Sequence, residues 1–249
     1  STNKLSLLDG YLGFNSLNQS LTILTEYEQT NGKFKGSATA GILLEATVTT
    51  VTGELDFEAG HQTISGITSN LLPATGGINL ASDLVTGGLT VSGGSFTTSD
   101  NITLTVNNTT DVDASSSLTT GTGAAFSTGT LTNNGTVTLG GSGTVSNVLT
   151  MNDASLDFTG QSLTLGGDIS MNGTSTFINN ENSNLTLNDG TAAWDLHSSI
   201  STLNNLTINR SSGVNMSANL NVGGELTLTD GSLAINGHTL TINGPMAGT

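Results

Sequence analysis

Hydrophobic and small polar residues alternate in short runs along the whole chain, and turn residues separate the runs. The clearest case is the stretch 226–242, in which Leu-Thr-Leu-Thr, Leu-Ala-Ile and Leu-Thr-Ile are divided by Asp230-Gly231 and Asn236-Gly237. Alternation with a period of two predicts half-buried strands, because successive side chains of a strand point to opposite faces. The stretch therefore predicts strand, turn, strand, turn, strand. No long window has the three-and-four spacing of a helix.

The same pattern occurs four times. Related copies begin at Leu5, Leu89 and Leu149, and the copy at Leu149 aligns with 226–242 without a gap. The similarity extends beyond these stretches to longer related blocks at about 53–107, 121–165 and 192–243. Self-similarity of this kind predicts a repeat architecture, in which each unit buries too little surface alone and stacks on its neighbours.

A parallel β-solenoid (β-helix) of short stacked coils accounts best for this pattern. The alternative is a series of small antiparallel β-sandwiches, because Asp-Gly and Asn-Gly are also preferred hairpin turns. The uneven spacing of the copies and the lack of a recurrent large core residue favour the solenoid. The two interpretations differ at Leu226: a solenoid pairs it with residues one coil away, with Asp230-Gly231 and Asn236-Gly237 as corners, whereas a hairpin pairs it within the motif.

Composition excludes several classes of function. The chain has 249 residues, of which 9% are charged and 4% aromatic, and its net charge is -15. Such a surface repels phosphate backbones, so we expect no nucleic-acid partner. The absence of cysteine excludes disulfides, thiolate metal sites and a cysteine nucleophile. No apolar run is long enough to span a membrane. Because the chain starts at Ser1, we interpret it as a mature or excised piece of an exported protein.

With these residues in hand, the chain resembles long, repetitive, exported surface proteins of bacteria, especially of the Bacteroidetes type. The resemblance rests on the block 226–244, which ends in Asn243-Gly244, and on Pro245 to Thr249, which resembles the lead-in to a further block. It covers nearly the whole chain. The resemblance implies export, surface display and a role as a β-strand-repeat adhesin, stalk or filament. It implies no catalytic residues.

The strongest candidate for a metal site is an acidic triplet. Glu54, Asp56 and Glu58 alternate, so a strand would place all three carboxylates on one face, with His61 just beyond. That arrangement suits calcium, or an acid pair for glycoside hydrolysis. A solvated acidic face explains it better, because only the aspartate recurs in the related block, as Asp195. We therefore predict no catalytic residue and no cofactor, with calcium at this triplet as the single candidate.

Other candidate chemistry is weaker still. Asp111 and Asp113 form a similar pair without a third ligand nearby, and His61, His197 and His238 have no metal-binding spacing. There is no Gly-x-Ser-x-Gly motif for a serine nucleophile and no phosphate-binding loop. Outward Thr-x-Thr pairs, such as 103–105 and 227–229, are compatible with ice binding. Threonine is, however, a good strand residue on any solvated face.

The sequence therefore predicts a non-enzymatic, extracellular or cell-surface structural protein that forms part of an adhesin, stalk or self-assembling filament. Alternatives are a carbohydrate-binding or carbohydrate-cleaving β-helix and, less favoured, an ice-binding solenoid. We expect residues 1–36, which hold Lys4, Lys33 and Lys35, to be an N-terminal cap or junction, and residues 37–249 to be the repetitive solenoid. The expected partners are further copies, joined head to tail, and glycans or cell-surface polymers.

Overall fold

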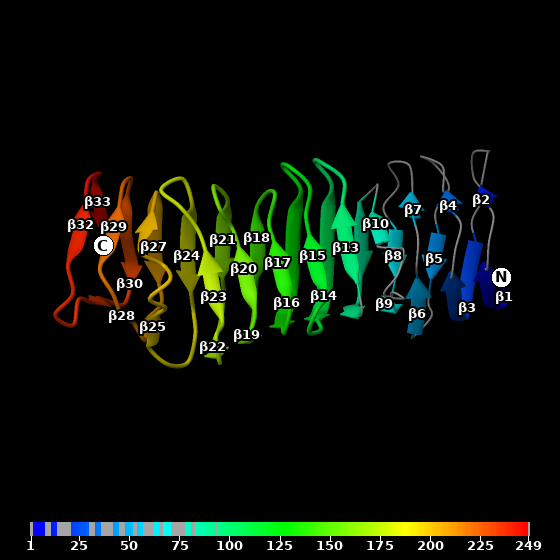
Figure 1. The fold of residues 1–249 in the computed structure, drawn as a ribbon, viewed down its shortest axis with the longest axis horizontal. Helices are drawn as coiled ribbons and strands as arrows, with labels where there is room; N and C mark the ends of the chain where they lie inside the picture. The colour runs from blue at the N-terminus through cyan, green and yellow to red at the C-terminus, as the bar shows by residue number, and fades with distance from the viewer. Residues whose placement is uncertain are drawn as a thin grey trace.

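The protein is an all-β parallel solenoid (Figure 1). The computed structural model describes Leu80 and residues 83–91 and 94–248, and it describes Ser92 and the strands before residue 80 by their backbone alone. The strand pairings it contains are parallel and join residues about one coil apart in the sequence. This confirms the predicted solenoid and rules out the antiparallel sandwiches.

Short strands follow one another along the entire chain. The strands of the N-terminal part are β1 (Thr2–Leu7), β2 (Tyr11–Gly13), β3 (Leu21–Gln29), β4 (Lys33–Lys35), β5 (Ile42–Leu44), β6 (Val48–Val51), β7 (Glu54–Asp56), β8 (Gln62–Ile64), β9 (Ile67–Asn70) and β10 (Ile78–Leu80). The middle part contains β11 (Leu84–Thr86), β12 (Leu89–Ser92), β13 (Ser95–Thr98), β14 (Thr103–Val112), β15 (Ser117–Thr119), β16 (Ala125–Asn133), β17 (Thr136–Thr138), β18 (Gly143–Val145), β19 (Leu149–Asn152), β20 (Ser155–Asp157), β21 (Ser162–Leu165), β22 (Ile169–Asn172), β23 (Thr176–Ile178) and β24 (Asn184–Asn188). The C-terminal part contains β25 (Trp194–Leu196), β26 (Thr202–Leu203), β27 (Asn205–Asn209), β28 (Val214–Met216), β29 (Leu220–Val222), β30 (Leu226–Asp230), β31 (Leu233–Ala234), β32 (Leu240–Ile242) and β33 (Met246–Gly248).

Each coil contributes one strand, or half of a longer strand, to each of three faces of the rod, and the faces are numbered in the order in which these strands follow one another in the chain. Face 1 is continuous along the rod and contains the first half of β3, β5, β8, β11, the first half of β14 and of β16, β18, β21, β24, β27, β30 and β33. Face 2 follows it in each coil and runs through β12, the second halves of β14 and β16, β19 and β22, and then β25, β28 and β31. Face 3 closes the coil with β13, β15, β17, β20 and β23, and then β26, β29 and β32.

The core is a column of apolar side chains inside the three faces. On face 1 the inward row includes Leu104, Phe126, Leu163, Leu185 and Leu206, each at most 3% exposed. Parallel, in-register stacking places like positions above one another, so the alternation seen in the sequence becomes a dry inner row and a polar outer row.

The corners absorb the differences in coil length. On face 1, Leu104 and Phe126 are partners 22 residues apart, whereas Phe126 and Gly143 are partners only 17 residues apart. Some corners are tight enough to require glycine: a Cβ on Gly167 would lie 1.6 Å from the carbonyl oxygen of Asn147. The uneven spacing of the repeats is therefore compatible with regular stacking.

Stretch 226–242 is one coil, as predicted. Leu226 pairs with Leu206 on one side and with Met246 on the other. Gly231, with φ of 84°, and Gly237, with φ of 82°, lie in the corners that follow β30 and β31. Left-handed backbone of this kind suits glycine at a change of direction. The parallel pairing of Leu226 with other coils makes both pairs corners between faces, not hairpin tips.

The copies are not all in phase with the solenoid. Those that begin at Leu5, Leu89 and Leu149 start on face 2 and end on face 1. The last copy starts at Leu226 on face 1 and ends on face 3. The pattern has thus moved by one face, and the move occurs between β21, which ends the third copy, and β25, which begins the last long block.

Pairing continues across the predicted domain boundary at residue 36. Strand β2 pairs with β4, and β4 pairs with β7, in one sheet. The strands of residues 1–36 thus belong to the same ladders as those that follow. That this segment acts as an N-terminal cap or junction stays a prediction.

Candidate functional site

The acidic triplet predicted as a calcium candidate lies in and after β7. The register places Glu54 beside Lys33 and Asp56 beside Lys35 of the preceding coil. Glu58 and His61 lie outside the described residues, and only the backbone of Glu54 and Asp56 is described. Calcium binding at Glu54, Asp56 and Glu58 therefore stays a prediction, now with two lysines as register neighbours.

Several acidic residues in the described part accept hydrogen bonds from backbone N–H groups at the corners between faces. In four corners an aspartate Oδ1 accepts the backbone N–H of a threonine one coil later, at 2.7 to 2.8 Å: Asp83 from Thr103, Asp100 from Thr122, Asp153 from Thr174 and Asp168 from Thr191. Asn205 and Asn219 do the same for Glu225 and Thr239. Corner N–H groups have no ladder partner, so these side chains replace one. The acidity of the chain is thus partly structural.

Two of these carboxyl groups have lowered pKa values. The pKa of Asp153 lies below its ordinary value because the backbone N–H of Thr174 and then its hydroxyl donate to the carboxylate. The pKa of Asp168 is lowered mainly by the hydroxyl and N–H of Thr191. Hydrogen bonds to the ionised form favour it, so both groups are held as acceptors and are unsuited to act as proton donors.

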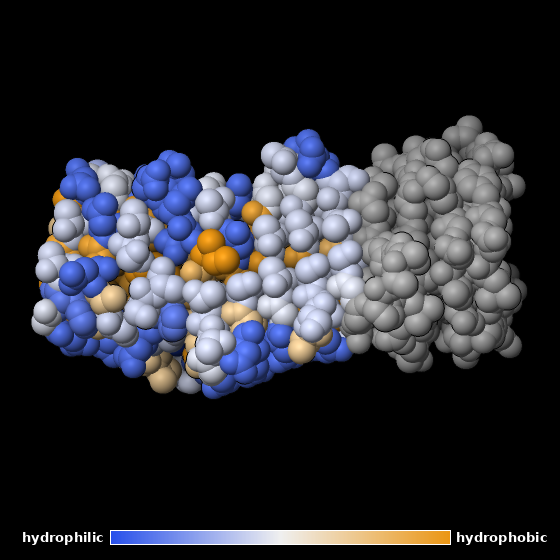
Figure 2. Space-filling view, in the orientation of Figure 1, coloured by the Kyte–Doolittle hydropathy of each residue, from blue (hydrophilic) through white to orange (hydrophobic). Residues whose placement is uncertain are grey.

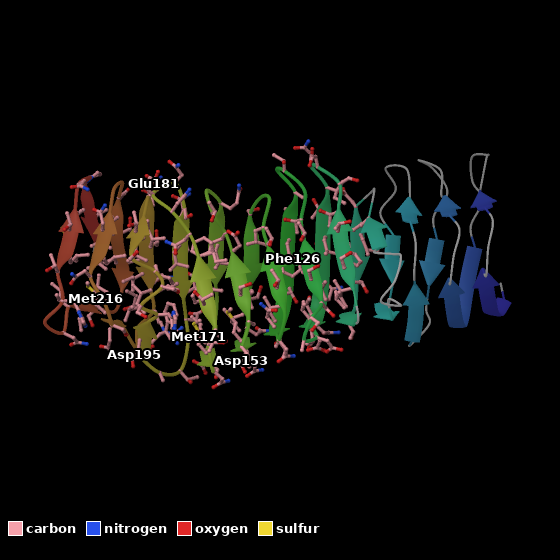
Figure 3. The ribbon with its side chains drawn as sticks, in the orientation of Figure 1. Phe126, Asp153, Met171, Glu181, Asp195 and Met216 are labelled. Carbon is pink, nitrogen blue, oxygen red and sulfur yellow. The ribbon has the colours of Figure 1, made fainter. Side chains whose placement is uncertain are left out.

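The remaining predicted candidates do not converge. Asp111 lies in the outer row of face 2 between Thr90 and Thr132. The ring of His197 contacts the hydroxyl of Ser199 at 2.8 Å, and His238 lies in the corner before β32. Figure 3 shows the labelled acids Asp153, Glu181 and Asp195 apart from one another on the rod. Among the residues described, no group of three or more His, Cys, Asp or Glu could hold a metal ion.

The most developed polar cluster surrounds Arg210, which the sequence did not mark as a candidate site residue. Its side chain is 2% exposed. The guanidinium donates to the carbonyl oxygen of Ala192 from Nε at 3.1 Å and from Nη2 at 2.8 Å, and to that of Gly167 at 2.8 Å. It also lies 3.4 Å from Oδ1 of Asp168. Arg210 therefore joins three successive corners between faces 1 and 2.

The local chemistry of Arg210 points to a structural role. Burial lowers its pKa, and the charge of Asp168 partly offsets this effect. Gly190 leaves room for the guanidinium, because a Cβ there would lie 2.0 Å from Cζ of Arg210. The cluster occupies the coils in which the repeat pattern moves by one face. A lone arginine in a chain so poor in basic residues was the available signal for it.

Aromatic residues fill the core in the same coils. Phe158, Phe177 and Trp194 form an edge-to-face series with ring centroids 6.2 Å apart at each step. All three are at most 7% exposed, and the other described aromatic residues, Phe96 and Phe126, are buried as well. No described aromatic ring is therefore free to stack on a sugar.

Hydrophilic and near-neutral residues cover most of the visible described part of the outer surface, with small hydrophobic patches between them (Figure 2). A depression of about 460 Å³ lies over the corners between faces 2 and 3, lined by Ser, Thr and Asn together with Asp153. Beside it the amides of Asn134, Asn152 and Asn172 form a ladder with hydrogen bonds of 2.7 and 2.8 Å. These side chains bind the next coil and not a common centre.

Face 1 has a regular outer row of hydroxyl groups. One such residue per coil lies in register, and the row comprises Thr105, Ser127, Thr144, Thr164, Thr186, Thr207 and Thr227. Each is half-buried by its neighbours in the row. Uneven coil lengths thus do not disturb this row.

Comparison of the chain with protein-family models, with curated proteins and with solved structures gave no significant match. Within the described residues, no helix is long and apolar enough to cross a membrane.

Proposed function

We propose that the chain is a non-enzymatic structural segment of an extracellular or cell-surface protein, serving as a rod in an adhesin, stalk or filament. The observation that carries this proposal is the uninterrupted parallel ladder of face 1, from β3 to β33. In a solenoid each coil contacts only its neighbours along one axis, so the length and stiffness of the rod grow with the number of coils.

The way in which polar groups are used supports the proposal. Corner aspartates and the asparagine ladder bind an adjacent coil, and Arg210 binds the two preceding coils. A chain without cysteine has no disulfides, and these contacts hold its coils together along the axis instead. A catalytic site would instead draw side chains of different coils toward one cleft.

Two alternatives each have one supporting observation. The hydroxyl-lined depression near Asp153 supports a carbohydrate-binding surface, although the buried aromatic rings weaken it. The outer threonine row of face 1 supports ice binding, because strands about 4.8 Å apart repeat its hydroxyl groups regularly. Neither observation explains the corner contacts along the rod, so the structural role is preferred.

Three measurements test the structural role. Small-angle X-ray scattering of the dilute chain should give the profile of a thin rod, and antibodies should label intact cells of the source organism without permeabilisation. The chain should release no reducing sugar from a panel of polysaccharides and should not shape growing ice crystals. Sugar release that is lost in Asp153→Asn, or ice shaping that is lost in Thr164→Tyr, would replace the proposal by the corresponding alternative.

A further inference from the structure

Among the described residues, face 1 alone keeps its ladder through the coils that follow β21. On face 2 no pairing joins β22 to β25, and on face 3 none joins β23 to β26. On face 1, by contrast, β21, β24, β27 and β30 pair in an unbroken series. Face 1 therefore gives the rod a long outer surface in its middle coils, whatever coils precede or follow them.

Columns of small polar side chains run along this surface. The central column is the hydroxyl row described above, and amide columns flank it in β24 and β27. On one side Nδ2 of Asn205 donates to Oδ1 of Asn184 at 2.8 Å, and on the other side Nδ2 of Asn209 donates to Oδ1 of Asn188 at 3.4 Å. These hydrogen bonds along the axis hold the amides in place before any partner binds.

Face 1 is nearly free of charge, although the chain has a net charge of -15. From β11 to β33, the strands of face 1 contain a single charged residue, Asp230 at the end of β30. Acids lie instead in the corners at its two edges, with Asp100 and Glu181 in corners before the face and Asp168 and Asp189 in corners after it. A partner that approaches face 1 therefore meets hydroxyl and amide groups at the centre and carboxylates at the rim.

We propose that a second copy of this chain docks on face 1, so that two rods associate side by side with their hydroxyl rows in contact. Hydroxyl and amide groups both donate and accept, so a face made of them can pair with an identical face. A second copy also has the same spacing of about 4.8 Å between coils, so the coils of one rod meet those of the other in a regular way. This inference rests on the proposed structural role and names the partner and its contact surface.

The size of the surface sets the expected strength of the contact. From β11 to β30, face 1 extends for about 35 Å along the axis, because neighbouring strands lie about 4.8 Å apart. Its strands have 3 residues in β18 and 5 in β24 and β27, which corresponds to a width of about 10–16 Å. The contact therefore covers about 350–550 Å² per copy, less than the roughly 800 Å² of a standard interface. Association of two chains should be weak, and each further coil enlarges the contact.

Repulsion at the rim makes this association depend on ionic strength. Both copies are acidic, and the corner carboxylates of one rod approach those of the other. At an ionic strength of about 0.15 M, exposed charges more than about 8 Å apart are largely screened, whereas contacts between uncharged rows change little. Association should therefore increase with added sodium chloride, which is the opposite of what an interface held by ion pairs would show.

The test compares two lysine substitutions at half-buried threonines in outer rows. Thr186→Lys places a charge in the middle of the face 1 row. Thr150→Lys places the same charge in the outer row of face 2, between Thr132 and Ser170. Sedimentation velocity over a range of concentrations should show dimers or larger assemblies of the wild-type chain and of Thr150→Lys. For Thr186→Lys the concentration needed for assembly should rise by about tenfold or more, as expected when a charge is left unpaired at an interface centre.

A second variant keeps the test valid if the lysine at 186 disturbs the fold. Asn184→Asp adds a charge to face 1 with almost no change of shape and keeps the oxygen that accepts from Asn205. It should weaken association in the same direction as Thr186→Lys. Circular dichroism and the urea midpoint of each variant show whether the fold is kept.

Each outcome bears on the inference. Assemblies that are thicker than one rod in negative-stain images, that increase with salt and that the face 1 variants weaken more than Thr150→Lys does support it. Monomers at every concentration and salt, assemblies that only lengthen, weaker association at higher salt or equal effects of the variants overturn it. Monomers that still scatter as thin rods leave the proposed function standing, whereas a compact monomer rejects both.

Discussion

Replacement of Arg210 by alanine tests how the rod is held together where its repeat pattern moves by one face. The guanidinium contacts Gly167 and Ala192, so its loss separates three successive corners at once. Hydrogen bonds from a charged donor contribute about 1.5–3 kcal/mol each. Ala192 is exposed, so water replaces part of what is lost. We therefore expect a loss of about 2–4 kcal/mol in the free energy of unfolding.

The only tryptophan of the chain reports on this region. Trp194 is buried and lies two residues after Ala192, so its fluorescence follows the unfolding of the coils around Arg210. With a slope of about 2 kcal/mol per molar urea, the expected loss moves the Trp194 midpoint down by about 1–2 M. Because stacked coils couple only to their neighbours, circular dichroism of Arg210→Ala should separate into two steps, with coils on either side unfolding apart.

The matched control is Asp168→Asn, which keeps an oxygen that can accept from Thr191 but removes the charge facing Arg210. Its side chain is 46% exposed, so this substitution should move the midpoint much less than Arg210→Ala does. The reasoning fails if Arg210→Ala leaves the Trp194 midpoint where it is in the wild type, or if both variants lower it equally. The first result would mean that packing alone holds the corners.

Further expectations concern a glycine, an acid and a buried hydroxyl. Gly190→Ala should destabilise the rod by about 2 kcal/mol or more in urea unfolding, because its φ is 103° and its Cβ would overlap Arg210; equal stability would show that the corner can relax. The folded pKa of Asp153 lies below its unfolded value of 3.8, so its contribution is complete above that value and is lost as pH falls through the lower, folded pKa. Acid unfolding of Asp153→Asn should therefore be less steep than that of the wild type, and superimposable curves would contradict the role of Thr174. Thr128→Val removes a buried hydroxyl that donates at 3.0 Å to the backbone carbonyl of Thr130, and it should lower the melting temperature by an amount that corresponds to about 1–3 kcal/mol; a stabilised variant would show that this bond contributes nothing.

Much of the fold could be predicted from local pattern alone. In the motif at 226–242 the alternation defined the strands, and Asp230-Gly231 and Asn236-Gly237 defined the corners, because left-handed backbone favours these residue types. The choice of parallel coils over hairpins followed from the uneven spacing of the copies and the lack of a recurrent large core residue. Side chains bound between coils were harder to foresee: Asp153 and Thr174 lie 21 residues apart, and nothing in either residue marks the other as its partner.

The sequence by itself determined that this protein consists of short strands, glycine-rich corners and stacked, related units. Only the tertiary structure decided on which face each unit lies, and it placed the copy at Leu149 on face 2 and the copy at Leu226 on face 1. The physical reason is that all three faces require the same alternation of apolar and polar residues, so the pattern carries no information about the face. Contacts across coils, such as those of Arg210 with Gly167 and Ala192, exist only once the stacking is set.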